Sequence, residues 1–439
     1  YRCDEAIKGT SDILCTCTGS GAPPPTPPAP SGSTLVTTPC VSLMLVGDYG
    51  SRTSTQERVA AGMAKVAQQR SPAVIAGVGD NIYGKGAEGQ PEVIVRWWKD
   101  IYLRHKSLRR PWHIVTGNHD WYTDARVERD FTTHPANVGG HWRMPGFWYK
   151  HTFRSSTSGL TVDTFWIDTQ VWKGSSVVSR YIGSQAAREQ KLWLEEALGN
   201  STADWKILFG HHPVYSRGSH GVTQELFQEL DPMMRRHGVQ AMVCGHDHSK
   251  HLIQFEGLSY VVNGAGGKSP RAPSNEYPSG RLIADHQNPG FATLRLCKGT
   301  PGQLEFFDKD GGNQSSSPIP AEAPTAGLLG SVRLANGRTL QLVGGAAGLS
   351  VPGPEQRCGD RVMREVDKFC PSADGSGCRV IADESATLTC EHYCREVNGL
   401  ACRGGWEQED EDCQPAAELG CHEARGSIDA LICECGPDE

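Results

Sequence analysis

The chain has 439 residues with 50 acidic and 43 basic side chains, a net charge of −7, and 38% hydrophobic residues. This length allows two or three domains, and the composition is typical of a folded globular protein and excludes an intrinsically disordered one. No apolar run approaches the roughly 18 residues of a membrane helix, which excludes a protein with a helical membrane span.

Charge and cysteine are unevenly distributed along the chain. Residues 358–439 carry 19 acidic and 7 basic side chains, a net of −12, which leaves +5 for the preceding 357 residues. Ten of the 16 cysteines lie between Cys358 and Cys435. This density predicts a disulfide-rich module formed in an oxidising compartment. A zinc module is the alternative, but paired C-x2-C motifs are missing. The weakly basic remainder is compatible with an anionic substrate.

The first 19 residues resemble the end of such a module. Cys3, Cys15 and Cys17 have the same spacing as Cys421, Cys433 and Cys435, and a Glu-Ala pair follows the first cysteine of each set at the same distance. We interpret this as an internal repeat. The hypothesis is that residues 1–19 end a preceding cysteine-rich module and that this chain is one unit of a longer array. Residues 20–39, which are rich in proline, predict an extended linker.

Between residues 40 and 311, short apolar runs bounded by glycine alternate with amphipathic stretches. The runs predict buried strands at 41–46, 73–76, 113–116, 207–209 and 241–243. The amphipathic stretches predict helices at 55–69, 92–104, 185–198 and 223–237. The first helix is expected to start at a capping box formed by Ser54 and Glu57. This alternation predicts an α/β domain with layered sheets.

Each of the five predicted strands ends in glycine followed by Asp, Asn or His. The five motifs are Gly47-Asp48, Gly79-Asp80-Asn81-Ile82-Tyr83, Gly117-Asn118-His119-Asp120, Gly210-His211-His212 and Gly245-His246-Asp247-His248. Glycine permits a sharp turn, and the ends of strands are where functional sites assemble. Oxygen and imidazole ligands in this number predict one or two first-row transition metals.

These motifs resemble the dinuclear metallophosphoesterases, and within them the purple acid phosphatases. Tyr83 in the second motif indicates the purple type. The segments 165–169, 190–194 and 210–216, and the short stretch before Asp48, resemble the small, tartrate-resistant subtype. The resemblance covers residues 41–310 and implies a four-layer αββα sandwich, to which the disulfide-rich C-terminal module is added. It also implies a secreted acid phosphatase that hydrolyses phosphate monoesters.

The resemblance assigns a role to each motif. Asp48, Asp80, Tyr83 and His248 would hold Fe(III), and Asp80 would bridge to a divalent Fe, Zn or Mn held by Asn118, His211 and His246. A hydroxide generated by the metals would attack phosphorus in line with the leaving alcohol. His119 and His220 match the two outer histidines of the family, which contact phosphate or protonate the leaving group.

Four further residues near the motifs have less specific expectations. Asp120 and Asp168 are expected to orient ligands or to be structural. His212, which replaces an aromatic residue common in the small subtype, is expected to pack beside the pocket. Cys244 is expected to be a buried strand residue rather than a nucleophile.

After the body, residues 312–357 predict a second linker with a β-hairpin around Asn336-Gly337, and residues 358–439 the disulfide module. Sequons at Asn200 and Asn313 favour a secreted glycoprotein, either extracellular or on the cell surface, with a lysosome or vacuole as the alternative. The expected partners are a phosphomonoester and, through the cysteine-rich modules, further copies of the chain or an extracellular matrix or filament. Nucleic acid is not expected.

Two other functions stay open at this stage. The phosphatase fold could serve as the building block of an extracellular array or filament, since fold alone does not fix function. The chain could also be a metallophosphodiesterase or nucleotide pyrophosphatase of the same superfamily.

Overall fold

The computed structural model describes residues 32–322 and 331–341. Elsewhere it describes a set of short strands, together with residues 390, 394 and 421. Within the described residues, no helix is both long and apolar enough to span a membrane.

The candidate motifs lie on two large sheets. One is seven-stranded, in the order β17 (Asn313–Ile319), β16 (Gly302–Asp308), β15 (Gly290–Cys297), β4 (Cys40–Val46), β5 (Val74–Val78), β6 (Trp112–Val115) and β7 (Trp142–Arg143). Strands β4 to β7 are parallel, whereas β15 to β17 pair antiparallel. Because β5 is buried throughout, its sequence is continuously apolar rather than alternating, whereas the equally buried β6 carries His113 among its apolar residues.

The second sheet has eight strands. Their order is β14 (Leu282–His286), β12 (Lys250–Phe255), β13 (Leu258–Asn263), β11 (Ala241–Cys244), β10 (Trp205–Phe209), β9 (Thr161–Trp166), β8 (Tyr149–Ser155) and β3 (Gly32–Val36). Its centre, from β9 through β10 and β11 to β13, is parallel. Apolar side chains of both sheets meet in one core, which includes Leu43, Val78, Trp166 and Phe209.

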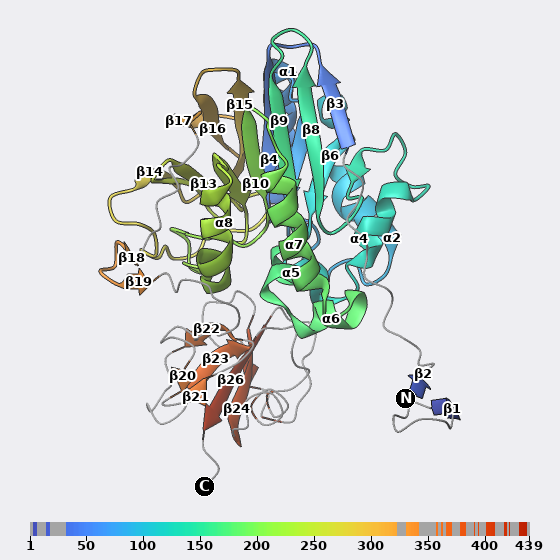
Figure 1. Cartoon of the computed structure of the whole chain (residues 1–439), viewed down its shortest axis with the longest axis vertical. Helices are drawn as coiled ribbons and strands as arrows, with labels where there is room; N and C mark the ends of the chain where they lie inside the picture. The colour runs from blue at the N-terminus through green and yellow to red at the C-terminus, as the bar shows by residue number, and fades with distance from the viewer. Residues whose placement is uncertain are drawn as a thin grey trace.

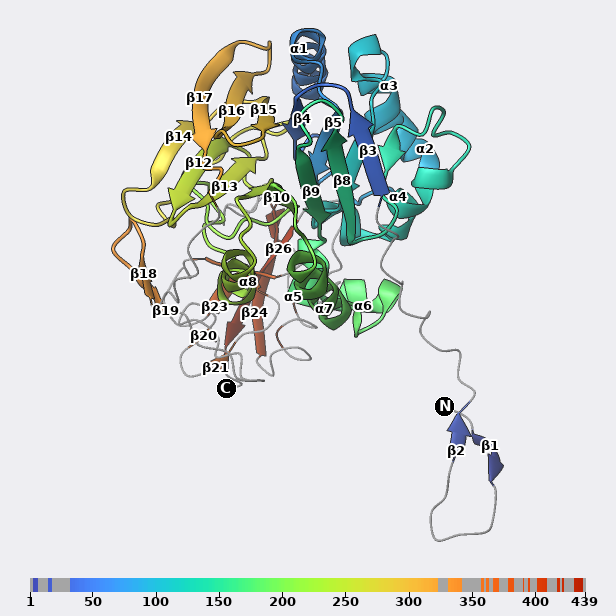
Figure 2. The ribbon, with the colours of Figure 1, turned by 45° about the horizontal axis from the view of Figure 1, so that its top comes forward.

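Helices cover the outer face of each sheet. Beside the seven-stranded sheet lie α1 (Ser54–Arg70), α2 (Pro91–Ile94), the π-helix η1 (Val95–Lys99) and α3 (Asp100–Tyr102). Beside the other lie α5 (Thr169–Lys173), α7 (Ala186–Gly199), the π-helix η5 (Leu226–Leu230) and α8 (Asp231–Arg236). Figure 2 shows the strands between α1 and α3 above and α5, α7 and α8 below. This layering confirms the αββα fold class.

Shorter helices complete the loops between these layers. They are the 3-10 helices η2 (Lys106–Leu108), η3 (His119–Tyr122) and η4 (Phe131–Thr133), and the α-helices α4 (Arg126–Asp130) and α6 (Ser176–Ile182). The predicted strands all form. The predicted helices at 92–104 and 223–237 form with a π-helical segment in each, η1 and η5.

The cap of α1 differs by one residue from the prediction. Thr53, not Ser54, is the N-cap, because its hydroxyl accepts a hydrogen bond from the Gln56 amide at 3.3 Å. The Gln56 side chain in turn accepts from the Arg52 amide at 2.6 Å. Gln56 therefore takes the part that was predicted for Glu57, and Glu57 is exposed in the first turn, where its charge favours the helix dipole.

Two strands fall inside the predicted linkers. Strand β3 pairs with β8, and β17 completes the other sheet beside β16, so the sheets extend beyond residues 40–311 (Figure 1). The predicted hairpin is confirmed as β18 (Ser331–Arg333) and β19 (Thr339–Gln341). Its Val332 and Leu340 are buried against the core beside α8, so this segment is part of the packed body. Residues 20–31 of the first linker lie outside the described part.

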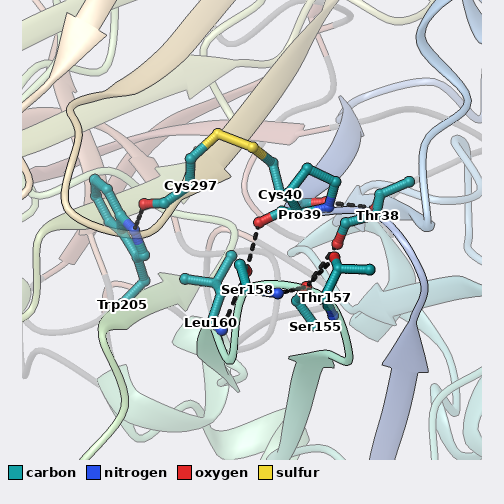
Figure 3. Close-up of a disulfide and its surroundings, with 9 residues drawn as sticks. All are labelled: Thr38, Pro39, Cys40, Ser155, Thr157, Ser158, Leu160, Trp205 and Cys297. Atoms are coloured by element: carbon teal, nitrogen blue, oxygen red, sulfur yellow. Dashed lines mark hydrogen bonds between the residues drawn. A yellow bond between two sulfur atoms is a disulfide. The ribbon is translucent and has the colours of Figure 1, made fainter.

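A disulfide joins two neighbouring strands of the body. Cys40 on β4 bonds to Cys297 on β15, beside Trp205, whose indole N–H donates to the Cys297 carbonyl at 2.9 Å (Figure 3). Cys244 is a free thiol buried on β11, as expected. In the C-terminal region the described disulfides are Cys390–Cys433, Cys394–Cys435 and Cys402–Cys421. They are consistent with the predicted cysteine-rich module.

The described strands of this region form two small sheets. Strands β22 (Val366–Cys370), β23 (Cys378–Ala382), β26 (Ala430–Gly436), β24 (Ala401–Gln408) and β25 (Ala417–Glu418) form one, and β20 (Arg357–Cys358) pairs with β21 (Arg361–Val362). At the other end of the chain, β1 (Cys3–Ala6) pairs with β2 (Cys15–Cys17). The internal repeat stays a prediction.

Candidate metal centre

The five motifs follow β4, β5, β6, β10 and β11, whose carboxyl ends meet at one edge of the two sheets. The Asp48 amide donates to Gly79 O at 3.0 Å, and the Gly245 amide donates to His211 O at 2.9 Å, so neighbouring loops are fastened to each other. At Gly245, an added Cβ would lie 2.3 Å from Asp48 Oδ2, and at Gly117 it would lie 2.2 Å from Asp80 Oδ1. These glycines, which were predicted as turn residues, therefore have a second role: without a Cβ they leave room for a carboxylate close to the backbone.

One group of side chains gathers around the Tyr83 hydroxyl. This hydroxyl donates to Asp48 Oδ1 at 3.0 Å and lies 3.1 Å from His248 Nε2. His248 Nε2 lies 3.6 Å from the same Asp48 oxygen. All three side chains are buried. The structure thus brings together Asp48, Tyr83 and His248 from three different loops.

A second group gathers around His211. Its Nδ1 donates to the Val78 carbonyl at 2.9 Å, which leaves Nε2 directed at Asn118 Oδ1, 3.0 Å away, and Asp80 Oδ1, 3.3 Å away. The Asn118 amide group donates to the Tyr122 hydroxyl at 3.1 Å, so its oxygen is the atom that faces His211. Three electron-pair donors therefore converge, an arrangement that requires a cation or a proton between them.

The two groups are contiguous. Ligand atoms of Asp48, Asp80 and His211 all lie within 4.8 Å of one another. Burial, and then the charge of Asp80, raise the pKa of Asp48 well above its usual range, because two buried carboxylates repel each other when both are charged. A bound cation would remove this penalty.

His246 joins the groups through its backbone and its ring. Its amide donates to Asp48 Oδ2 at 2.9 Å, and its ring centroid lies 5.1 Å from that of His211. Burial, followed by the charge of His220, lowers the pKa of His246 well below its usual value. A neutral imidazole is the form that binds a metal.

The two outer histidines lie on either side. His119 is buried; its amide donates to Asp80 Oδ1 at 3.1 Å, and its ring lies 4.5 Å from the Tyr83 ring. His220 is half-buried, with its ring 3.9 Å from the His246 ring. Its Nε2 lies 2.8 Å from Arg271 Nη1, and since a guanidinium can only donate, this nitrogen accepts.

Hydrogen bonds show how Asp120, Asp168 and His212, whose expected roles were less specific, are placed. Asp120 accepts from the amides of Gly117, Asn81 and Ile82 at 2.7, 3.2 and 3.0 Å. Asp168 caps α5 by accepting from the Gln170 and Val171 amides, and its burial raises its pKa to about 6. His212 Nδ1 bonds to Thr169 Oγ1 at 2.7 Å, and the ring packs 4.4 Å from His246, beside the centre.

Sequence reasoning assigned no role to three residues around the centre. Asp247 accepts from the Ser216 hydroxyl and from the His220 amide, the latter at 3.0 Å. Lys268 Nζ lies 4.4 Å from the centroid of the Tyr83 ring, and Arg271 contacts His220. The glycine-rich run Gly264-Ala-Gly-Gly267 directly before Lys268 was the available signal, because it follows a buried strand as the other motifs do.

The donor set fits a pair of metal ions. Ligand atoms about 2.0–2.2 Å from a first-row metal lie about 3 Å apart. Here the donor spacings run from 3.0 to 3.6 Å in the group around Tyr83 and from 3.0 to 3.3 Å in the group around His211. Carboxylate, phenol, amide and imidazole together suit iron, zinc or manganese better than magnesium or calcium, which prefer oxygen alone.

Comparisons with known proteins agree with this geometry. Residues 41–250 match the calcineurin-like phosphoesterase family. Purple acid phosphatase 17 of Arabidopsis thaliana is 31% identical over 286 residues, covering 61% of this chain and 81% of that protein. Tartrate-resistant acid phosphatase type 5 of Oryctolagus cuniculus is 27% identical over 308 residues, covering 65% and 93%. The solved structure of GAP50, the anchor in the inner membrane complex of Plasmodium, shares the fold, with a TM-score of 0.59, 19% identity, and coverage of 66% and 91%.

Proposed function

Because the chain belongs to the purple acid phosphatases of the calcineurin-like phosphoesterase family, we propose that it hydrolyses phosphate monoesters at acid pH. The observation that carries this proposal is the convergence of Asp48, Asp80 and His211 within 4.8 Å, with the Tyr83 hydroxyl 3.0 Å from Asp48. A carboxylate pair with a phenol and histidines is the donor set of a dinuclear centre that contains Fe(III).

In this proposal Asp48, Asp80, Tyr83 and His248 hold Fe(III), and Asp80, Asn118, His211 and His246 hold a divalent Fe, Zn or Mn. The phenol oxygen of Tyr83 is a hard, electron-rich donor that favours the ferric state. Asn118 brings no charge, so the second position keeps a divalent ion. Bound metals would supply an acidified water and polarise a phosphoryl oxygen.

The chain's own side chains orient the substrate. Asn118, His246 and His220 are the half-buried members of the site, so the ester is expected to approach from their side. His119 and His220 are assigned the contacts with the phosphate oxygens and the proton for the leaving alcohol. The Val78 carbonyl, by accepting from Nδ1, holds His211 in the tautomer whose Nε2 faces Asp80 and Asn118.

We further propose that the protein is secreted or lies in a lysosome-like compartment. The body disulfide Cys40–Cys297 and the three disulfides of the C-terminal region support an oxidising compartment. The sequon residues Asn200 and Asn313 are exposed, as glycosylation requires.

The test is hydrolysis of p-nitrophenyl phosphate at pH 5, combined with metal analysis and a visible spectrum. We expect two metals per chain, a broad visible charge-transfer band and turnover. A matched control is Asp310→Asn, which removes an exposed ion pair with Arg58. No turnover with two bound metals would contradict the proposal and favour the array or filament hypothesis. Preferential cleavage of bis-p-nitrophenyl phosphate by a colourless protein would favour the diesterase hypothesis.

A further inference from the structure

A carboxylate lies against the turn that follows His220. Glu276, in the loop between β13 and β14, is half-buried, and its Oε2 accepts a hydrogen bond from the Val222 amide at 3.2 Å. An added Cβ at Gly221, whose φ is 70°, would lie 2.4 Å from the same oxygen. A side chain at Gly221 would therefore displace the carboxylate, whereas glycine lets Glu276 hold the turn directly after His220.

The segment around His220 has no regular structure of its own. Residues 210–223, between β10 and the helical segment that contains η5, form neither helix nor strand. The His220 amide donates to Asp247 Oδ1 at 3.0 Å. Its ring accepts from Arg271 Nη1 at 2.8 Å and lies 3.9 Å from the His246 ring. Side chains from other loops therefore determine where the imidazole lies, with one carboxylate at its amide and a second at the following turn.

The β18–β19 hairpin holds Glu276 from the other side. Glu276 Oε1 accepts from the Arg338 guanidinium, which leaves Oε2 for the Val222 amide. Asn336 Nδ2 donates to the same Oε1 at 3.5 Å. The Arg338 and Glu276 side chains are 33% and 21% exposed, so solvent screens this ion pair less than a fully exposed one. One carboxylate thus links the hairpin to the turn after His220.

The hairpin is a fixed part of the body. Val332 and Leu334 are buried in the core beside α8. The hairpin backbone is hydrogen-bonded to residues 275–279, for example from the Ala335 amide to Tyr277 O at 2.9 Å. Both views show the hairpin on the β14 side of the body (Figures 1 and 2). The guanidinium that reaches Glu276 therefore starts from a backbone fixed by packing and by hydrogen bonds.

We propose that Glu276 is a positioning residue for His220 and that Arg338 of the hairpin keeps it in place. This inference rests on the proposed function, in which His220 contacts the phosphate or protonates the leaving alcohol. Because Glu276 Oε2 is used by the Val222 amide, its effect on the ester passes through the position of the His220 ring. The hairpin, which follows every predicted site residue in the sequence, thereby completes the side of the centre from which the ester approaches.

The expected effect follows from what each group would do without its partner. If Arg338 is removed, Glu276 gains rotamer freedom and hydration by turning to solvent, and the Val222 amide loses its acceptor. The His220 ring would then occupy a range of positions. Because a misplaced group lowers the rate of a reaction steeply, we expect kcat/KM to fall while the metals stay bound.

The experiment is a double-mutant cycle in the full-length, metal-loaded protein. In the parent, Glu276→Gln and Arg338→Met should each lower kcat/KM for p-nitrophenyl phosphate roughly tenfold. In a His220→Gln background the same changes should alter kcat/KM by less than about twofold, because no imidazole is left to position. Arg338→Lys, which keeps the charge, should recover most of the loss. Arg236→Met is the matched control, because Arg236 forms an exposed ion pair with Glu195, and it should leave kcat/KM unchanged.

Two further readouts do not depend on turnover. Hydrogen–deuterium exchange should be faster in peptides that contain Gly221 and Val222 in both variants, and unchanged around Gly245, whose amide donates to His211 O. The affinity for orthophosphate should fall several-fold in both variants when His220 is present, and should not change in the His220→Gln background.

Two outcomes of the cycle would overturn the inference. One is an equal loss of kcat/KM with and without His220, and the other is a kcat/KM within about twofold of the parent in both variants, since the ion pair would then be only structural. If the parent fails to cleave p-nitrophenyl phosphate, the proposed function fails. The orthophosphate cycle then decides the inference, which is overturned if the affinity does not depend on Glu276 and Arg338.

Discussion

Three candidate ligands adopt backbone conformations that normally favour glycine. Asp48, Asp80 and His246 have φ of 55°, 50° and 68°. Such conformations cost about 1–3 kcal/mol per residue and persist where the surroundings enforce them. Hydrogen bonds hold two of these turns in place. The Asp48 amide donates to Gly79 O, and the His246 amide donates to Asp48 Oδ2. The chemistry of these side chains, not local stability, accounts for their presence at these turns.

At the same scale, Tyr83→Phe tests the ferric site. Removing the hydroxyl 3.0 Å from Asp48 and 3.1 Å from His248 should abolish the visible band and lower kcat/KM by at least about a hundredfold. Tyr122→Phe is the control for the visible band, which it should leave unchanged, because Tyr122 contacts Asn118 and His119 but is not in the ligand set. A visible band that survives in Tyr83→Phe would show that this phenol is not the ferric ligand.

At the scale of elements, the site depends on how the loops after β5 and β6 are joined. Asp120, at the start of η3, accepts from Gly117 in its own loop and from Asn81 and Ile82 in the other. These bonds hold Asp80 and Asn118 in one arrangement. Burial, and then Glu128, raise the pKa of Asp120 well above its usual range, and the pKa of Glu128 itself rises to about 7 through burial.

Asp120→Asn is expected to loosen this junction. The amide group would place a donor against backbone N–H groups, which costs about 1–3 kcal/mol of unfolding free energy. We expect kcat/KM to fall about 10- to 100-fold, with a matching loss of metal affinity. Urea unfolding and metal titration measure the two effects. Asp310→Asn should leave the metal affinity unchanged and should lower the free energy of unfolding only by the small contribution of an exposed ion pair. Unchanged metal affinity in Asp120→Asn would show that Asp120 does not position the ligands.

At the scale of the whole molecule, the interface between the two sheets contains a histidine pair. His113 of β6 and His151 of β8 are buried with ring centroids 4.5 Å apart. Neither nitrogen of His113 has a hydrogen-bond partner in the described part of the chain, whereas His151 Nε2 bonds to Thr34 Oγ1 of β3 at 2.9 Å. Burial, with Arg143 nearby, lowers the pKa of His151 to about 4, and burial lowers that of His113 well below its usual value.

Because of this pair, we expect the free energy of unfolding to decrease as the pH is lowered. Because the folded pKa of His151 is below the unfolded value of 6.5, its stabilising contribution is complete above about pH 6.5 and is lost as pH falls towards 4. From pH 7.5 to pH 5 the loss is about 2 kcal/mol for His151 alone. The double variant His113→Phe, His151→Gln should flatten this dependence in urea unfolding, and half-exposed His134→Gln should not. An unchanged slope in the double variant would refute the assignment.

Much of the site was predictable because each ligand lies directly after a short apolar run. Local periodicity marks the strands, and glycine followed by Asp, Asn or His marks their ends, so the five motifs could be named without coordinates. The resemblance to the purple acid phosphatases then selected the candidate ligands from them, namely Asp48, Asp80, Tyr83, Asn118, His211, His246 and His248. The structure places all seven at one edge of the sheets. Their roles toward Fe(III) and the divalent metal remain predictions that the metal analysis tests.

The sequence by itself determined the layered fold class, the strand-end motifs and the separation of a body from a cysteine-rich tail, because these depend on neighbouring residues. Only the tertiary structure decided which distant segments pair. The polar strand β17, with the sequence Asn-Gln-Ser-Ser-Ser-Pro-Ile, and the proline-flanked β3 gain their order from partners far along the chain. Lys268 and Arg271 likewise approach Tyr83 and His220 through loop contacts that no local pattern encodes. Long-range packing, which sequence periodicity does not record, therefore decides what surrounds the candidate metal centre.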